Sequence, residues 1–319
     1  MLVLSGRDIA GLVDIAALIP AMATSLRATA EGRAELPLRS MVRLPGADRM
    51  GIMGGWLADL PGHGVKVLSL FPGNPARGLS SHTGLVLLFD SETGLPRAVM
   101  DAAEITALRT AAATAVATDC LAPAGARRVA LIGCGEQAAS HIAAMRAVRP
   151  IERFVVWGRD PAKAAAFAAL HGVAQAGSVA EAIADADIVV SATPAREPLI
   201  TAAMLRPGQH INAVGASVPV MQEYAADVVP AVRFYTDYIP SMEAQAAEVI
   251  EARAKGLVGA NFHAIELGAV LNGTAPGRQN GEEITFYRSL GIAAQDLAAA
   301  HLILERAQAA GRGIEVDMQ

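Results

Sequence analysis

A short glycine-rich turn lies near the middle of the 319-residue chain. The apolar run Arg128–Ile132 leads into Gly133-Cys134-Gly135-Glu136-Gln137-Ala138, and a helical pattern follows as far as Val148. A strand, a glycine turn and a helix in this order let a backbone approach a pyrophosphate and direct a helix N-terminus at its charge. The pattern predicts a dinucleotide site that includes Gly133, Gly135 and Ala138. The alternative is a tight strand-to-helix turn without a ligand.

The second strand after the turn bears on which dinucleotide is bound. In NAD-binding proteins this strand typically ends in an acid that binds the ribose 2′-hydroxyl. Here that position falls on Gly158, and Arg159 follows, whose guanidinium can pair with a 2′-phosphate. Asp160 precedes Pro161, an arrangement typical of a helix N-cap. We therefore expect NADP(H) to be favoured over NAD(H).

A lysine precedes the turn in an apolar setting. Alternation from Val65 to Leu70 places Lys66 on the face opposite Val65 and Val67, together with Leu68. A lysine in a partly apolar cavity needs an anion, and loss of hydration lowers its pKa. The alternative is a lysine that reaches the surface along its own stem.

The elements around Lys66 predict a mostly antiparallel first domain. Residues 7–30 have the spacing of one amphipathic helix, and residues 40–99 form short apolar runs separated by Gly and Pro. Turn residues at 90–94 predict a hairpin. Residues 101–121 then form an alanine-rich helix that leads into a second domain.

From Arg127 the sequence alternates between strands and helices, which predicts a parallel, doubly wound sheet. The expected strands are Val129–Ile132, Phe154–Trp157, Ile188–Ser191, His210–Val214 and Val232–Tyr235. Residues 281–319 have a helical pattern and are expected to return to the first domain. The fold class is α/β: a Rossmann-type domain at 113–288, and an α+β substrate-binding and dimerisation domain formed by 1–112 with 289–319.

Composition limits the possible partners. The chain is 53% hydrophobic and 18% charged, with a net charge of −5 and two cysteines. Such a chain buries a large core and has no basic block for nucleic acid or an anionic membrane. Two cysteines make no disulfide framework, which favours a reducing cytoplasm. We expect a cytoplasmic protein with a small-molecule substrate, without a membrane segment or a metal site.

Several segments in order resemble the ornithine cyclodeaminase/μ-crystallin family over nearly the whole chain. They are Arg43-Leu44-Pro45, Gly64-Val65-Lys66, Ser81-His82-Thr83-Gly84, Ile105–Ala112, the glycine turn, Ile211–Ala216 and Glu283–Phe286. The resemblance implies a homodimer whose first domain builds the substrate pocket, with the nicotinamide in a cleft between the domains.

The resemblance also implies residue roles. Arg43 and Lys66 would hold a substrate carboxylate. The residues expected to contact the cofactor are Thr83, Arg109, Thr110, Gly133, Gly135, Glu136, Gln137, Ala138, Arg159, Thr193, Ser289, Leu290 and Gly291. Outside this family, Arg43 and Arg109 would be interpreted as surface or interdomain ion pairs.

Two positions differ from the deaminating members of the family. Those members carry an acid after Gly-Gly or Gly-Ala, whereas this chain has Ser217, a far weaker acid or base. A second acid would fall near Met53 or Gly54. A serine at this position resembles the ketimine-reducing, μ-crystallin-like branch. Ser217 or His82 could hydrogen-bond an imine nitrogen, although a loop serine that satisfies local backbone is the alternative for Ser217.

These observations predict an NAD(P)H-dependent reductase of a small 2-imino acid. The best candidates are the cyclic ketimines 1-pyrroline-2-carboxylate and 1-piperideine-2-carboxylate, which would give L-proline and L-pipecolate. Four alternatives remain open: an ornithine cyclodeaminase that releases ammonia, an alanine-type dehydrogenase, an iminosuccinate reductase, and a non-catalytic protein that binds a small ligand and NADP.

Overall fold

The computed structural model describes residues 1–259 and 261–318. The chain has an α/β fold that divides into two units. Unit 1 comprises Met1–Arg109 and Ile292–Gln319, and unit 2 comprises Thr110–Gly291. The domain boundaries expected from sequence, 112/113 and 288/289, each lie three residues from these. The first boundary falls inside helix α3 (Ala102–Leu121).

Unit 1 is built on a twisted sheet in the order β16-β1-β7-β6-β5-β4-β2, with β3 paired to β4. All neighbouring strands are antiparallel except β1 and β7, so the expected antiparallel character is confirmed. The strands are β1 (Leu2–Leu4), β2 (Ala34–Glu35), β3 (Ser40–Arg43), β4 (Arg49–Leu57), β5 (Gly62–Leu70), β6 (His82–Asp90), β7 (Pro96–Asp101) and β16 (Ile314–Glu315). The helices are α1 (Gly6–Ile9), α2 (Ile15–Ala30), the 3-10 turn η1 (Asn74–Arg77) and α10 (Ala293–Ala310).

The single helix expected over residues 7–30 was wrong, because two helices occupy this region. Ser5 caps α1 through a capping box with Asp8. Gly11 then adopts φ +77°, a left-handed conformation that ends the helical run. Asp14 begins α2 by accepting a hydrogen bond of 2.7 Å from the amide of Ala17.

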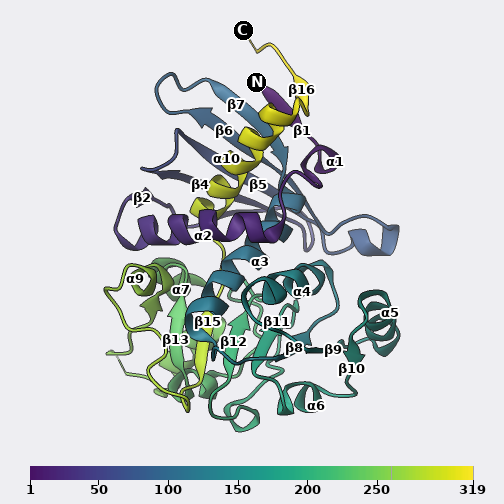
Figure 1. Cartoon of the computed structure of the whole chain (residues 1–319), viewed down its shortest axis with the longest axis vertical. Helices are drawn as coiled ribbons and strands as arrows, with labels where there is room; N and C mark the ends of the chain where they lie inside the picture. Colours follow the sequence, from purple (N-terminus) through teal and green to yellow (C-terminus); the bar gives the residue numbers. More distant parts are fainter. Residues whose placement is uncertain (260, 319) are drawn as a thin grey trace. The chain divides into compact units, whose positions relative to one another are not determined.

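Helix α10 packs across β4, β5 and β6 (Figure 1). Glycines on these strands make the close approach feasible. A Cβ atom at Gly55 would lie 2.9 Å from Cβ of Ala293, and one at Gly64 would lie 2.7 Å from Cδ2 of Leu297. Lys66 is two residues beyond Gly64 on the same face of β5, so its side chain also points toward α10.

Unit 2 contains a fully parallel sheet in the order β10-β9-β8-β11-β12-β15-β13-β14 (Figure 1). The chain runs outward from β8 to β10 and then returns to β11 on the other side, as in a doubly wound fold. The strands are β8 (Arg128–Ile132), β9 (Arg153–Trp157), β10 (Ala174–Gln175), β11 (Ile188–Ser191), β12 (His210–Ala213), β13 (Arg233–Thr236), β14 (Ile265–Glu266) and β15 (Thr285–Arg288). The helices are α4 (Glu136–Val148), α5 (Pro161–His171), α6 (Val179–Ala184), α7 (Ile239–Gln245), α8 (Ala247–Ala254) and α9 (Leu267–Leu271), with the 3-10 turns η2 (Ala202–Met204) and η3 (Ala226–Ala231).

The expectation of a helical segment over residues 281–319 was wrong in its first part. Thr285–Arg288 form β15, which is inserted between β12 and β13 and is entirely buried. Within residues 281–318, which the structure describes, the helical part is Ala293–Ala310. Two adjacent aromatic residues, Phe286 and Tyr287, favour a strand at this point, but four residues are too few for a periodicity to be recognised.

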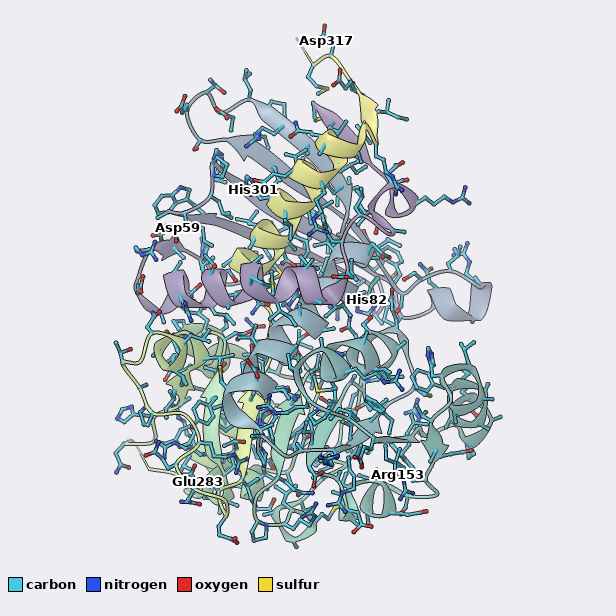
Figure 2. All side chains as sticks on the ribbon, in the orientation of Figure 1. Asp59, His82, Arg153, Glu283, His301 and Asp317 are labelled. Atoms are coloured by element: carbon cyan, nitrogen blue, oxygen red, sulfur yellow. The ribbon has the colours of Figure 1, made fainter. Side chains whose placement is uncertain are left out.

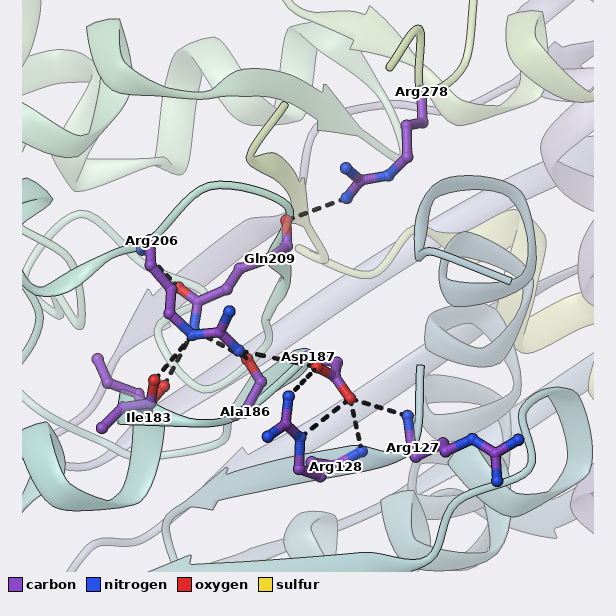
Figure 3. Close-up of polar contacts among 9 residues, drawn as sticks. Arg127, Arg128, Ile183, Ala186, Asp187, Arg206, Gln209 and Arg278 are labelled. Atoms are coloured by element: carbon purple, nitrogen blue, oxygen red, sulfur yellow. Dashed lines mark hydrogen bonds and ion pairs between the residues drawn. The ribbon is translucent and has the colours of Figure 1, made fainter. Parts of the chain in front are cut away.

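The amino ends of the parallel strands are joined by ion pairs (Figure 3). Asp187, directly before β11, accepts hydrogen bonds from the amides of Arg127 and Arg128 at 2.9 and 3.0 Å. The guanidinium of Arg128 lies 2.9 Å from the same carboxylate. Arg206 joins this group by donating to the carbonyls of Ala184 and Ala186. Since ligands bind at the carboxyl ends of such strands, we interpret this cluster as structural.

In the described part of the chain, no helix has both the length and the apolar character needed to cross a bilayer. Residues 1–259 and 261–318 contain no group of three or more His, Cys, Asp or Glu side chains arranged to hold a metal ion.

Candidate active site

Lys66 in unit 1 belongs to a buried group of charges. Its Nζ lies 2.7 Å from the carboxylate of Asp296, in the first turn of α10, and the two side chains are each 1% exposed. Arg109 Nε donates to Oδ1 of the same carboxylate at 2.9 Å, and Arg109 Nη1 donates to Oε1 of Gln295 at 2.8 Å. One carboxylate therefore holds two cations.

The charges in this group do not balance. Two buried cations, Lys66 and Arg109, share the single anion Asp296, and the buried Nε2 of Gln295 has no hydrogen-bond partner among the described residues. The pKa of Lys66 is lowered to about 7, mainly by burial; Asp296 opposes this shift, and Arg109 contributes to it. Burial alone would raise the pKa of Asp296, but Arg109 and Lys66 lower it on balance. An additional anion is the ligand that this group can stabilise.

Arg39, which the sequence analysis missed, acts on this group, whereas Arg43 is remote from it. The positive charge of Arg39 lowers the pKa of both Lys66 and Asp296. Arg43 is exposed at the end of β3. In the strand register it lies opposite Arg49 of β4, which in turn lies opposite Leu70 of β5. Leu70 is four residues beyond Lys66, so Arg43 lies about 13 Å farther along the sheet. The structure does not bring Arg43 and Lys66 together.

His82 lies in the same row as Arg43, because it pairs with Leu70 (labelled in Figure 2). It is exposed, and its Nδ1 lies 2.8 Å from Oγ of Ser81. Thr83 is exposed as well and pairs with Ser69. Neither residue joins the buried charges around Lys66, so their expected roles stay predictions.

In unit 2 the glycine turn has the shape expected of a phosphate-binding loop. Gly133 adopts φ +115°, and a Cβ there would lie 2.6 Å from the carbonyl oxygen of Ala192, so only glycine fits. Gly135 is the N-cap of α4 and has no side-chain cap, and nothing lies within 4 Å of where its Cβ would be. The amides at the start of α4 are therefore available to an anion.

Buried polar atoms near the expected cofactor residues support the same interpretation. Three of them have no hydrogen-bond partner among the described residues: Oγ1 of Thr110, Oε1 of Gln137 and Oγ of Ser289. Buried polar groups are normally satisfied, so unpartnered atoms on residues expected to contact a ligand fit a bound dinucleotide. Glu136 is exposed at the start of α4, and Ala138 is 1% exposed within it.

The end of β9 is arranged as the sequence indicates. Asp160 caps α5 by accepting hydrogen bonds from the amides of Ala162 and Lys163 at 3.0 and 3.2 Å, so the expected capping role is confirmed. The exposed Arg159 guanidinium has no ion pair with any described residue. A Cβ at Gly158 would lie 2.7 Å from Sγ of Cys134. Arg159 is thus available to a phosphate, and Gly158 has no room for an acid while Cys134 keeps its position.

Four further expected residues lie in three loops that follow parallel strands. Thr193 follows β11 and is 9% exposed, and the half-buried Ser217 follows β12. After β15, the amides of Leu290 and Gly291 donate to Oδ2 of Asp237 at 3.0 and 2.7 Å. All three loops lie at the carboxyl ends of the strands, which is the edge where doubly wound folds bind ligands.

A model of the ornithine cyclodeaminase/mu-crystallin family matches residues 1–311. The chain belongs to this family. A Delta(1)-pyrroline-2-carboxylate reductase of Bacillus thuringiensis is 33% identical over 99% of this chain and 100% of its own length. Family membership confirms the resemblance inferred from the segments between Arg43 and Phe286.

Solved structures of family members superpose over essentially the whole chain. Delta(1)-pyrroline-2-carboxylate reductase of Thermococcus litoralis, in complex with NADH and L-proline, has a TM-score of 0.94 at 32% identity and covers 99% of this chain and 100% of its own. An archaeal alanine dehydrogenase dimer with bound NAD has a TM-score of 0.93 at 30% identity, covering 100% and 99%. The expected Rossmann-type α/β fold is thereby confirmed.

Several residues that the structure places at these sites are not revealed by the sequence patterns. Asp296 and Gln295 could have been recognised as polar residues at the start of the alanine-rich segment Ala293–Ala300. Arg39 follows Pro37-Leu38 immediately before β3, where its only distinguishing signal is its place on the same face as Arg43.

Proposed function

We propose that this chain is an NAD(P)H-dependent reductase of cyclic 2-imino acids, with 1-pyrroline-2-carboxylate and 1-piperideine-2-carboxylate as the best candidate substrates. The observation that supports this most strongly is the uncompensated positive charge around Lys66 in unit 1. A 2-imino acid always carries a carboxylate, and a buried site with more cations than anions favours it.

Three cationic side chains form the proposed carboxylate anchor. Lys66 and Arg109 are held by Asp296, and Arg39 adds charge at the same place. Because Asp296 orients both cations before any ligand arrives, little ordering is required when the carboxylate binds. Gln295 contributes Nε2 as a neutral donor, which has no hydrogen-bond partner among the described residues. The family resemblance implies that Arg43 holds the substrate carboxylate together with Lys66. We propose that Arg39 does so in place of Arg43.

Reduction needs few further groups from the protein. The dihydronicotinamide, when bound, supplies a hydride to C2 of the imine, while a proton on the ring nitrogen completes the amine. A cyclic imine can carry that proton before it binds, so the protein has to position the ring and exclude water. Ser217 is proposed to hydrogen-bond the ring nitrogen, and its weak acidity is sufficient for that task.

A deaminating lyase is the less favoured alternative. That reaction requires a carboxylate to handle the substrate amine, and this chain has Ser217 at that position and Met53 and Gly54 where a second acid would lie. Reduction of an acyclic imine remains a second candidate, because the alanine dehydrogenase superposes as well as the pyrroline-2-carboxylate reductase. A non-catalytic binding protein would share the anchor but show no turnover.

The preferred cofactor is proposed to be NADP(H). Arg159 is exposed, carries no internal ion pair in the described structure and follows Gly158, where an NAD-specific acid would otherwise stand. The two solved relatives named above contain NADH and NAD, so this preference depends on Arg159 of this chain alone.

A homodimer formed through unit 1 is the proposed assembly. The face of the sheet opposite α10 carries apolar residues in register, with Ile52 paired to Val67 and Val67 paired to Leu85. Leu85 is 49% exposed and Trp56, on the same face, is 42% exposed. A second copy is the partner that would bury such a face, as the dimer of the related alanine dehydrogenase suggests. Replacing Leu85 with Glu should yield a monomer by light scattering.

The location is proposed to be the cytoplasm. Neither Cys120 nor Cys134 is in a disulfide in the described structure, which suits a reducing compartment.

The decisive experiment is a spectrophotometric assay with 1-pyrroline-2-carboxylate or 1-piperideine-2-carboxylate and NADPH. We expect loss of the reduced-nicotinamide absorbance and formation of L-proline or L-pipecolate. Ammonia release from ornithine without net cofactor oxidation would instead identify the lyase. Cofactor binding without turnover of either imine, pyruvate with ammonia, or iminosuccinate would identify a binding protein.

A further inference from the structure

A buried carboxylate in unit 2 connects two loops at the carboxyl edge of the sheet. Glu223 is 1% exposed. Its Oε1 accepts hydrogen bonds from the amide and the hydroxyl of Thr193 at 2.7 and 2.8 Å. Its Oε2 accepts from the amides of Gly215 and Ala216 at 2.8 and 3.2 Å. One side chain thus joins the loop after β11 to the loop after β12.

The two loops are in close contact where Glu223 joins them. A Cβ at Gly215 would lie 2.1 Å from the amide nitrogen of Thr193 and 2.3 Å from its carbonyl oxygen, so only glycine fits. The backbone amides of both loops need hydrogen-bond acceptors at this contact. An ionised carboxylate provides two oxygens, and both accept. A glutamine would provide only one such oxygen, because its NH₂ group is a donor.

A buried arginine holds the same loop by its carbonyl groups. Arg288, at the end of β15, donates to the carbonyl oxygens of Ala213 and Ala216 and forms an ion pair of 2.9 Å with Glu248. Its charge also favours the ionised form of Glu223, although burial raises the pKa of Glu223 on balance. The loop that carries Ser217 is therefore fixed through both its amides and its carbonyls.

We infer that Glu223 is a positioning residue for dinucleotide binding, which acts by locking the loops of Thr193 and Gly215–Ser217 to each other. The inference rests on the proposed function, in which unit 2 binds the dinucleotide at this edge. Glu223 is proposed to contact neither the dinucleotide nor the imino acid. It preserves the loop conformation, so that ordering these loops does not reduce the affinity for the cofactor.

The chain offers a matched control at the opposite edge of the same sheet. Asp187 also accepts hydrogen bonds from two backbone amides, those of Arg127 and Arg128, and also faces an arginine (Figure 3). It differs in lying at the amino ends of the strands, away from the expected dinucleotide site. Glu223→Gln and Asp187→Asn therefore make comparable chemical changes in two different places.

The experiment compares both variants with the unmodified chain. NADPH affinity is measured by titration calorimetry, and thermal stability is measured alongside it. We expect Glu223→Gln to weaken NADPH binding about tenfold or more and to raise the KM for NADPH. The KM for the imine at saturating NADPH should change far less. Asp187→Asn should lower the melting temperature without changing NADPH affinity.

Equal effects of the two variants on NADPH affinity, or none from Glu223→Gln, would overturn the inference. If Glu223→Gln does not fold, Glu223→Asp replaces it, because the shorter carboxylate keeps its charge but cannot span both loops. An unmodified chain that binds NADPH but reduces no imine would refute the proposed reaction, and the affinities would still decide the role of Glu223. An unmodified chain that binds no dinucleotide would refute both.

Discussion

Lys66 and Asp296 form a fully buried ion pair across 230 residues of sequence, with 2.7 Å between Nζ and Oδ1. The pair joins the middle of β5 to the first turn of α10. An isolated pair of this kind contributes little net stability, because both charges lose their hydration. Asp296 also pairs with a second cation, Arg109, so the group as a whole has a net positive charge that can bind an anion.

Removal of the lysine amine tests the anchor. Lys66→Met should lower kcat/KM for the imine roughly 100-fold or more, because a buried charge-assisted contact to the carboxylate is worth about 2–5 kcal/mol. NADPH affinity, measured by calorimetry, should be nearly unchanged. Lys255→Met is the control, since Lys255 is exposed and its ammonium pairs with Glu251 on the surface. Full activity in Lys66→Met would remove Lys66 from the site.

The pH dependence of imine binding follows from the lowered pKa of Lys66. The amine is charged below its pKa of about 7 and neutral above it, so the KM for the imine should rise as the pH increases through 7. Asp296 favours the charged form, and Asp296→Asn should therefore move this inflection to lower pH. Measurement of KM between pH 5.5 and 9 checks both expectations. An inflection that persists in Lys66→Met would instead be caused by protonation of the imine nitrogen.

Arg159 is expected to distinguish the two nicotinamide dinucleotides. Arg159→Ala should raise the KM for NADPH by about 10- to 100-fold, the equivalent of one lost charge-assisted contact to phosphate. The KM for NADH should change little, because that dinucleotide lacks the 2′-phosphate. Steady-state kinetics with each dinucleotide measure the ratio. An equal loss with both would assign Arg159 to a part of the cofactor that they share.

Gly158 and Cys134 should show coupled effects. Gly158→Asp introduces the acid typical of NAD-binding proteins. The Cβ of the new side chain would lie 2.7 Å from Sγ of Cys134, which is too close for both atoms to keep their positions. We expect the single variant to be destabilised and the double variant with Cys134→Ala to recover stability and to favour NADH. A double-mutant cycle on melting temperature and on both KM values measures this coupling. Additive effects would show that the thiol moves aside freely.

Much of unit 2 could be predicted from sequence because its signals are local. A strand, a glycine turn and a helix form one continuous segment at Arg128–Val148, and the capping role of Asp160 depends on its immediate neighbours. The strand β15 was missed because it has only four residues, all buried, and so lacks alternation.

The anchor in unit 1 could be predicted only in part. Alternation along β5 correctly indicates which face carries Lys66, since a residue's parity in a strand decides its face. Its partner Asp296 could not be found this way, because local patterns do not reveal which distant helix covers that face. Arg39 and Arg43 are four residues apart and share a face, so only the pairing of β3 with β4 shows which lies nearer Lys66.

Acid sensitivity of the fold is expected from buried histidines. His301 on α10 (labelled in Figure 2) is 4% exposed, and burial lowers its pKa from 6.5 to about 4. Between these values the unfolded chain binds the proton and the folded chain does not, so stability falls as the pH decreases from 6.5 to 4. At pH 5 the loss from one such histidine is roughly 2 kcal/mol. His141 and His210, with pKa values lowered by burial to about 4 and 3, act in the same direction.

His301→Leu isolates one of these contributions. His301 packs against Gly62, and its Nε2 has no hydrogen-bond partner among the described residues, so an apolar side chain of similar size should be tolerated. We expect the variant to lose less stability than the unmodified chain between pH 7 and pH 5, measured by urea unfolding at each pH. An unchanged pH dependence would mean that His301 becomes protonated in the folded chain, which its burial between α10 and β5 argues against.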